Sequence, residues 1–192
     1  MTTGALVLAA GRARRFGSDK RLAKLPGGGS VIAQTLTRIT EAGLPVLLCV
    51  PDLDDLPAQL PVPAQVRVLR CARAGEGMGA TLAEGMAQLP AEWDAVLVCL
   101  ADMPWVRVAT YRALADASAV DRICRPVHAQ RPGNPVAFGR DFFPQLCELA
   151  GDVGAKPLVA ASADRVQPVE VNDPGIHVDI DLPADITARP AP

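Results

Sequence analysis

Short, continuous apolar runs separate longer segments of mixed polarity along most of the chain. Residues 5–10 and 45–50 are such runs, and continuous apolar character is typical of strands that are covered on both faces. Residues 65–71 alternate between apolar and polar positions and predict a third strand. Residues 94–104 predict a fourth strand that ends in an acidic loop. The pattern therefore predicts several buried strands of a mostly parallel sheet.

Segments of helical periodicity lie between these strands. Residues 31–42 carry apolar side chains at helical spacing, with Ser30 suited to cap the start of the helix and Gly43 suited to end it. The remaining predicted helices are residues 52–60, 78–89, 107–118, 140–149 and 155–163, and the remaining predicted strands are residues 121–128, 135–139 and 165–171.

The alternation of strands and helices predicts an α/β fold. We expect a single domain over residues 1–187, Rossmann-like, with three α/β/α layers and a mostly parallel sheet. Residues 188–192 are expected to be a frayed tail. Because ligands of such sheets bind outside the carboxyl ends of the strands, residues that follow a strand are the first candidates for a site.

Charge and hydropathy exclude several classes of protein. The formal net charge of −2 argues against the broadly basic surface of a nucleic-acid or membrane-surface protein. No apolar run approaches the roughly 18 residues of a membrane span, and the first run lacks the basic segment of a signal peptide. We therefore expect a cytoplasmic protein with neither a nucleic-acid nor a membrane partner.

The cysteines favour a reducing environment. Their number is odd and none forms a CxxC pair, so buried thiols are expected instead of a disulfide framework or a zinc site. They are Cys49, Cys71, Cys99, Cys124 and Cys147.

A strongly basic loop follows the first predicted strand. Its charged residues are Arg12, Arg14, Arg15, Lys20 and Arg21. Backbone amides of a glycine-containing loop can hold phosphate oxygens, while Arg and Lys side chains add donors and positive charge. The loop matches neither GxxxxGK[ST] nor GxGxxG. A solvated basic loop without a ligand is the alternative interpretation.

The order of residues in this loop resembles a family signature. Leu8-Ala9-Ala10-Gly11-x-x-x-Arg15-x-Gly17-x-x-Lys20 resembles "LAAGxSxRMGxxK" of the nucleotidyltransferases that activate sugars and cofactors. More narrowly, it resembles the branch that attaches a nucleotide to molybdopterin, the molybdenum cofactor cytidylyltransferases and guanylyltransferases. Five further segments resemble family motifs in the same order: residues 77–82 (GMGxSL), 102–104 (DMP), 133–138 (GxPxxF), 151–155 (GDxGAR) and 179–185 (DIDTPEDL).

Carboxylates at two places in the chain are candidates for a metal site. Asp102 follows a predicted strand that is otherwise uncharged, and oxygen ligands suit Mg²⁺. Asp179 and Asp181 alternate with aliphatic residues, so a period of two residues would place them, with His177, on one face. Two carboxylates on one face repel each other unless a cation or donor separates them. The alternatives are a helix start at Asp102 and a solvated edge strand near Asp181.

The resemblance implies roles for individual residues. Arg15, Lys20 and Asp102 would be catalytic, and Asp102, Asp179 and Asp181 would hold Mg²⁺. The nucleotide would be bound by Leu8, Ala9, Ala10, Gly11, Gly77, Met78, Gly79 and Thr81. The acceptor would lie on the side of the loop 131–135 and Asp152, where Arg125, His128 and Arg131 would meet its negative charge.

The implied reaction is a Mg²⁺-dependent nucleotidyl transfer. An NTP, CTP in preference to GTP, would donate the nucleotidyl group to the phosphate of molybdopterin and release pyrophosphate, and a molybdoenzyme would be a possible partner. The preference for CTP rests on Ala10, because relatives that use GTP have glycine there. The alternatives are another phosphorylated acceptor, such as a sugar or alcohol phosphate, a cofactor-binding accessory protein without catalytic activity, or a plain α/β interaction domain.

Overall fold

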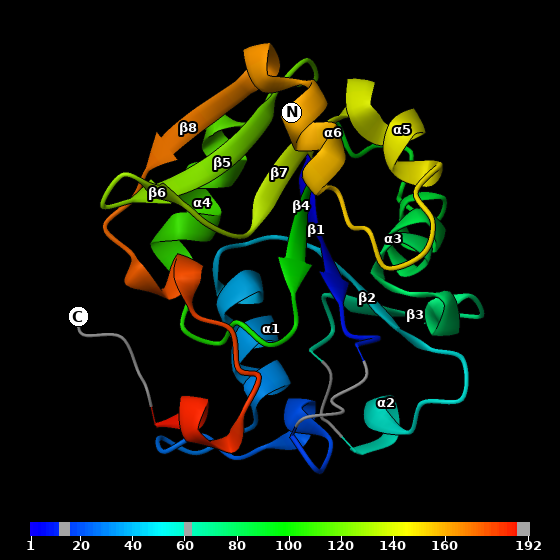
Figure 1. Cartoon of the computed structure of the whole chain (residues 1–192), viewed down its shortest axis with the longest axis vertical. Helices are drawn as coiled ribbons and strands as arrows, with labels where there is room; N and C mark the ends of the chain where they lie inside the picture. The colour runs from blue at the N-terminus through cyan, green and yellow to red at the C-terminus, as the bar shows by residue number, and fades with distance from the viewer. Residues whose placement is uncertain (12–15, 60–62, 188–192) are drawn as a thin grey trace.

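The predicted strands pair in a single mixed sheet. The computed structural model of the chain describes residues 1–11, 16–59 and 63–187. The strands within these ranges are β1 (Thr3–Leu8), β2 (Val46–Pro51), β3 (Val66–Cys71), β4 (Ala95–Leu100), β5 (Ile123–His128), β6 (Arg131–Pro132), β7 (Val136–Gly139) and β8 (Val166–Glu170). Their order in the sheet is β3-β2-β1-β4-β7-β5-β6, and β8 also pairs with β5 (Figure 1).

The central strands are parallel, as the apolar runs predict. β1 lies between β2 and β4 and is parallel to both, and β2 is parallel to β3. Leu6 and Val7, which point to opposite faces, are both fully buried. Burial on both faces explains why the strand is continuously apolar. The arrowheads of β1 and β4 point the same way in Figure 1, toward the C-terminal segment.

Helices cover the two faces of the sheet. They are α1 (Val31–Glu41), α2 (Leu56–Gln59), α3 (Met78–Met86), α4 (Val108–Ala117), α5 (Phe143–Cys147) and α6 (Lys156–Ala161). One apolar cluster packs α1 and α4 against Ala5 and Val7, and another packs α3 and α5 against Leu6 and Leu8. The predicted three-layer α/β/α arrangement with a mostly parallel sheet is therefore confirmed.

A glycine brings α3 unusually close to the sheet. A Cβ added to Gly85 would lie 2.5 Å from Leu6 Cδ1 and 2.8 Å from Cys49 Sγ. Glycine inside a helix costs about 1 kcal/mol relative to alanine, so its presence here is explained by this close approach. The contact fixes α3 against β1 and β2 and so determines where the helix begins relative to the carboxyl end of β1.

The antiparallel part of the sheet was not predicted. β7 pairs antiparallel with both β4 and β5, and the short β6 pairs antiparallel with β5. Residues 140–149 were predicted as one helix, but they form a 3-10 turn (Arg140–Phe142) followed by α5. None of the helices in the described ranges combines the length and the apolar character that spanning a membrane requires.

The cysteines agree with the prediction at four positions of five. All are free thiols, and Cys49, Cys71, Cys99 and Cys124 are buried. Cys147 is exposed, so the prediction of a buried thiol is wrong there. The reason is its position on α5, where its neighbour Leu146 takes the buried side of the helix.

Candidate active site

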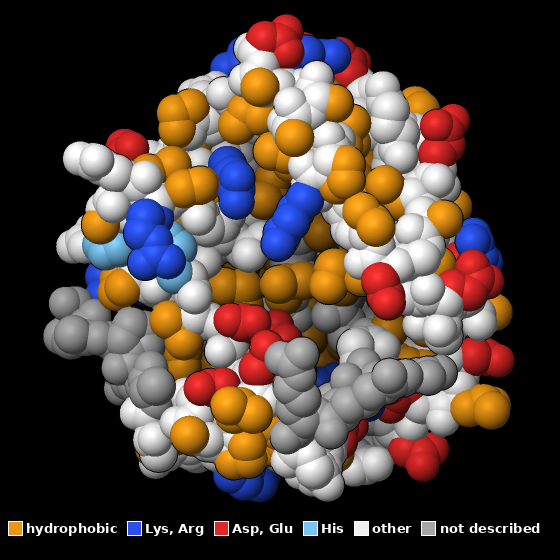
Figure 2. Space-filling view, viewed as in Figure 1, with side chains coloured by type: hydrophobic (Ala, Val, Ile, Leu, Met, Phe, Trp, Pro, Cys, Tyr) orange, Lys and Arg blue, Asp and Glu red, His pale blue; other side chains and the backbone are white. Residues whose placement is uncertain are grey.

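A cleft of about 570 Å³ opens at the carboxyl ends of β1 and β4. Figure 2 shows this face of the molecule, with acidic side chains in the central hollow and basic and histidine side chains over β5 and β6. Eleven of the predicted site residues line the cleft: Leu8, Ala9, Ala10, Gly11, Lys20, Gly77, Met78, Thr81, Asp102, Asp179 and Asp181. The predicted Arg15 lies outside the described residues.

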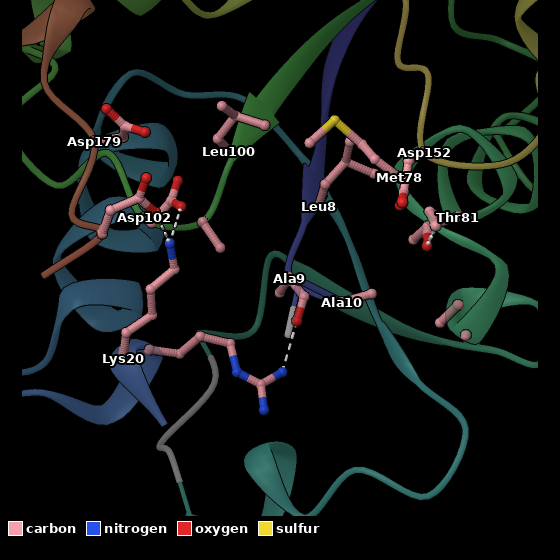
Figure 3. Close-up of a pocket in the computed structure, with 17 residues that line it drawn as sticks. Leu8, Ala9, Ala10, Lys20, Met78, Thr81, Leu100, Asp102, Asp152 and Asp179 are labelled. Carbon is pink, nitrogen blue, oxygen red and sulfur yellow. Dashed lines mark hydrogen bonds and ion pairs between the residues drawn. The ribbon is translucent and has the colours of Figure 1, made fainter. Parts of the chain in front are cut away.

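Lys20 connects segments from three parts of the chain. Its Nζ lies 2.7 Å from Asp102 Oδ2 and 2.8 Å from Asp181 Oδ1 (Figure 3). Burial lowers the pKa of the Lys20 ammonium, but the hydrogen bonds to the two carboxylates outweigh that effect, so its pKa is raised. Lys20 is therefore a protonated, positively charged group at neutral pH, held between two carboxylates.

Asp102 has the oxygen atom that a metal ion would need. Its Oδ2 accepts the hydrogen bond from Lys20, whereas Oδ1 is buried and has no hydrogen-bond partner among the described residues. Burial raises the pKa of Asp102, the nearby charge of Asp179 adds to that increase, and Lys20 opposes it. A buried carboxylate oxygen without a partner is unusual, and a bound cation would account for it.

The carboxylates fit Mg²⁺ in its common mode of binding. In the part of the chain that the structure describes, no three His, Cys, Asp or Glu side chains form a ready metal cluster. Mg²⁺ is usually bound through one or two carboxylates, with waters and substrate phosphates as the other ligands. Asp102, with Asp181 or Asp179 nearby in the same cleft, fits this requirement.

The segment that carries Asp179 and Asp181 differs from the prediction. Residues 178–182 form no strand, although the backbone is extended at Val178 and Leu182. Ile180 donates its N–H to the carbonyl oxygen of Asp102 over 3.0 Å and buries its side chain, which leaves Asp179 and Asp181 facing the cleft. The two aspartates and Ile180 therefore lie on opposite sides of the segment, as predicted, although the segment pairs with no strand that the structure describes.

Arg21 was not predicted as a site residue but shapes the turn after β1. Its Nη1 donates to the carbonyl oxygen of Ala9 over 2.6 Å, and its guanidinium pairs with Asp19 and Asp54. Arg21 also lines the cleft. In the sequence, Arg21 is one of several basic residues in the same loop. No sequence signal distinguishes an arginine that is held by hydrogen bonds from one that is exposed to solvent.

Several hydrogen-bond donors at the start of α3 are engaged within the protein. Gly79 does not line the cleft. The N–H groups of Gly79 and Ala80 donate to the carbonyl oxygen of Gly151 over 2.8 and 3.4 Å. The hydroxyl of Thr81 donates to the carbonyl oxygen of Gly77 over 3.0 Å. These donors are therefore satisfied within the protein and are not free for a nucleotide.

Asp152 and the basic residues expected near the acceptor lie apart. Asp152 lines the cleft together with Gly77 and Met78, whereas the loop at residues 131–135 does not line it. Among the basic residues, His128 and His177 have ring centroids 6.2 Å apart, and His177 Nε2 lies 2.9 Å from the carbonyl oxygen of Arg131. The three residues expected to meet the acceptor, Arg125, His128 and Arg131, do not line the cleft.

Replacing Gly77 by alanine is expected to lower the free energy of unfolding by about 1–3 kcal/mol. The backbone of Gly77 has φ +127° and ψ −175°, a region reserved for glycine, and an added Cβ would lie 2.3 Å from Asp152 Oδ1 and 2.6 Å from the backbone of Gly151. Urea denaturation measures the change. The matched control is Gly27→Ala, since a Cβ there meets nothing within 4 Å. Equal stability of the two variants would contradict the prediction.

Comparison with known proteins places the chain among nucleotidyltransferases. The model of the MobA-like NTP transferase domain matches residues 5–167. The crystal structure of Rv0371c from Mycobacterium tuberculosis H37Rv is similar, with a TM-score of 0.84 and 27% identity over 96% of this chain and 95% of that chain. No curated protein matches the chain.

Two further solved structures are similar to this chain. The complex of Rv0371C from the same organism with manganese has a TM-score of 0.79 and 26% identity over 96% of this chain and 95% of that chain. A nucleotidyl transferase from Methanothermobacter thermautotrophicus, Mth528, has a TM-score of 0.80 and 24% identity over 98% and 96% of the two chains. At that identity, Mth528 supports the fold alone.

Proposed function

Since the chain belongs to the MobA-like NTP transferase domain family, we propose that it transfers the nucleotidyl group of CTP to a molybdopterin-type acceptor and releases pyrophosphate. Transfer from an NTP follows from the family, whereas the preference for CTP over GTP and the acceptor are our proposal. One observation supports the site: Lys20, Asp102 and Asp181 meet at the carboxyl ends of β1 and β4, in one cleft with Ala10 and Gly77.

The two ends of the cleft suit the two ends of a nucleoside triphosphate. Lys20, Asp102 and Asp179 lie at one end, and Met78 and Thr81 lie at the other, with Ala9 and Ala10 between them (Figure 3). We assign the triphosphate to the first end, where an ammonium group can bind phosphate oxygens. The base then lies against α3 and the turn after β1.

Each residue has a defined task in this proposal. Two donors of the Lys20 ammonium are used by Asp102 and Asp181, which leaves the third for a phosphate oxygen. Arg15 is assigned to the triphosphate as well. Asp102, with Asp179 and Asp181 beside it, would hold a divalent cation. Mg²⁺ bound there would offset the negative charge that develops on the departing pyrophosphate.

A divalent cation is also supported by a relative, since a structure of Rv0371C is a complex with manganese. Mg²⁺ and Mn²⁺ both accept carboxylate, water and phosphate oxygens as ligands. We assign Mg²⁺ to this chain because its carboxylates suit a site that the substrate phosphates complete.

The acceptor phosphate is its own nucleophile in this proposal. A phosphate monoester is already anionic near neutral pH, because its second pKa lies near 6. The protein therefore needs no dedicated general base, and catalysis rests on positioning and on stabilisation of charge. Arg125, His128 and Arg131, with the loop at residues 131–135, are assigned to the negatively charged part of the acceptor.

The proposal is tested by measuring pyrophosphate release with each of the four NTPs, with and without molybdopterin, in the presence of Mg²⁺. We expect release to require both CTP and molybdopterin. A smaller base is expected to be preferred because the Cβ of Ala10 reduces the space beside the turn after β1. Release with GTP but not with CTP would contradict the base preference.

The other outcomes separate the remaining candidates. Release that requires a sugar or alcohol phosphate instead of molybdopterin would keep the reaction class and replace the acceptor. Binding of the nucleotide and of molybdopterin without any release would indicate an accessory protein that delivers a cofactor, with a molybdoenzyme as its partner.

A further inference from the structure

Asp152 presents an exposed carboxylate to the cleft, and none of the described residues engages it. It lies between α5 and α6 and lines the cleft near Met78 and Thr81 (Figure 3). Unlike Asp102 and Asp181, it has no hydrogen bond or ion pair with any residue that the structure describes. A charged hydrogen-bond acceptor held at a cleft wall is suited to a donor on a ligand.

A purely structural role for Asp152 is already filled by its neighbour. A carboxylate near the start of a helix often accepts hydrogen bonds from its first N–H groups. At α3, however, the carbonyl oxygen of Gly151 accepts those bonds from Gly79 and Ala80. The Asp152 carboxylate is therefore not needed as the cap of α3.

The backbone on either side of Asp152 makes close contacts, while the Asp152 side chain itself is exposed. The Gly151 hydrogen bonds hold the preceding residue, and Gly154 packs near Met78, whose Sδ would lie 3.1 Å from a Cβ added to that glycine. Asp152 Oδ1 would lie only 2.3 Å from a Cβ added to Gly77. Because residue 77 is a glycine, no side chain at that position competes with the Asp152 carboxylate for space.

Electrostatics determine which part of a nucleotide can approach Asp152. Figure 3 shows it at the end of the cleft opposite Lys20, Asp102 and Asp179. A carboxylate repels phosphate oxygens, whereas the ammonium of Lys20 attracts them. The base end of the nucleotide, which is uncharged and carries N–H donors, is the part that Asp152 can bind.

We propose that Asp152 accepts a hydrogen bond from the exocyclic amino group of cytosine and thereby makes the site select cytosine over uracil. This inference rests on the proposed nucleotidyl transfer. Cytosine presents N4–H₂ as a donor, and Asp or Glu is its usual side-chain partner. Uracil presents a carbonyl oxygen at the same position, so the carboxylate would face another acceptor and leave both groups unpaired.

The change Asp152→Asn reverses the hydrogen-bonding requirement at nearly constant size. An amide can turn either its NH₂ or its oxygen toward the base, so uracil gains a donor that the wild-type protein withholds. We expect the wild-type protein to bind CTP at least tenfold more tightly than UTP, and the ratio of the two Kd values to fall at least tenfold in Asp152→Asn. Asp152→Ala should weaken the binding of CTP and leave that of UTP unchanged or tighter.

Calorimetry on the full chain measures Kd for CTP, UTP and 2′-deoxy-CTP with wild-type protein and each variant. The matched control is Asp164→Asn, which alters an exposed carboxylate outside the cleft and should leave all three Kd values unchanged. An unchanged ratio of CTP to UTP in Asp152→Asn would overturn the inference. So would a change confined to the ratio of CTP to 2′-deoxy-CTP, since that result would assign Asp152 to the ribose.

Failure of this inference differs from failure of the proposed function. Binding is measured without turnover, whereas the proposed function is measured by pyrophosphate release. Selection of CTP that depends on Asp152 but occurs without release would contradict the catalytic proposal and support the inference. Release without any dependence of base selection on Asp152 would do the opposite.

Discussion

Replacing Asp102 by alanine is expected to reduce nucleotidyl transfer about a thousandfold or more while the fold remains intact. The variant loses one of the two carboxylate partners of Lys20 and also the buried oxygen atom assigned to the metal ion. Removal of a single group that stabilises developing charge costs on the order of 10²–10³ in turnover, and Asp102 is assigned to two such tasks. The fold should survive because the backbone carbonyl of Asp102, which accepts from Ile180, is unaffected.

Pyrophosphate release with saturating CTP and Mg²⁺ measures the loss, and thermal unfolding monitored by circular dichroism measures the stability. Asp141→Ala is a matched control, because Asp141 is an exposed partner of Arg165 outside the cleft. Near-full activity of Asp102→Ala would show that the metal assignment is wrong. A variant that is unfolded would leave Asp102→Asn as the decisive measurement, with the same expected loss of activity.

Replacing Lys20 by alanine is expected to lower kcat at least tenfold, which corresponds to about 1.4 kcal/mol in the activation barrier. The substitution removes the positive charge from a site where Asp102 and Asp181 both contact it, and where Asp179 lies nearby. Their negative charges would then repel a triphosphate without the opposing ammonium. Weaker binding of the nucleotide should accompany the slower transfer.

Steady-state rates of pyrophosphate release over a range of CTP concentrations separate the effects on kcat and KM. Lys24→Ala is the matched control, because it removes an exposed lysine close in sequence that does not line the cleft. If Lys20→Ala and Lys24→Ala had the same kcat, Lys20 would have no part in the transfer.

The sequence predicted most elements because their signals are local. The helix predicted at residues 31–42 is Val31–Glu41, with the side chain of Ser30 accepting from the N–H of Ala33 as its cap. A helix of this length is determined by capping and periodicity within a few residues. The first strand was less well placed: it was predicted at residues 5–10 and lies at Thr3–Leu8, because Ala9 and Ala10 are apolar but belong to the turn into the cleft.

The predicted site combines motifs that lie far apart in the sequence, and the sequence alone does not give their positions in space. Lys20 lies within hydrogen-bonding distance of both Asp102 and Asp181. This is possible only because β1 and β4 are adjacent and parallel and Ile180 of the C-terminal segment bonds to Asp102 in the loop after β4. Strand-end positions made this meeting a reasonable expectation. The roles of the same residues in catalysis stay a prediction until they are measured.

The sequence by itself determined the α/β class, the order of the elements and the family, since these depend on local periodicity and on short motifs. Only the tertiary structure decided that β7 is antiparallel, that Gly151 occupies the N–H groups of Gly79 and Ala80, and that Asp152 lies on the wall of α3. The physical reason is that these features arise from contacts between residues far apart in the chain. Such contacts are set by how the helices and strands pack, which no local pattern specifies.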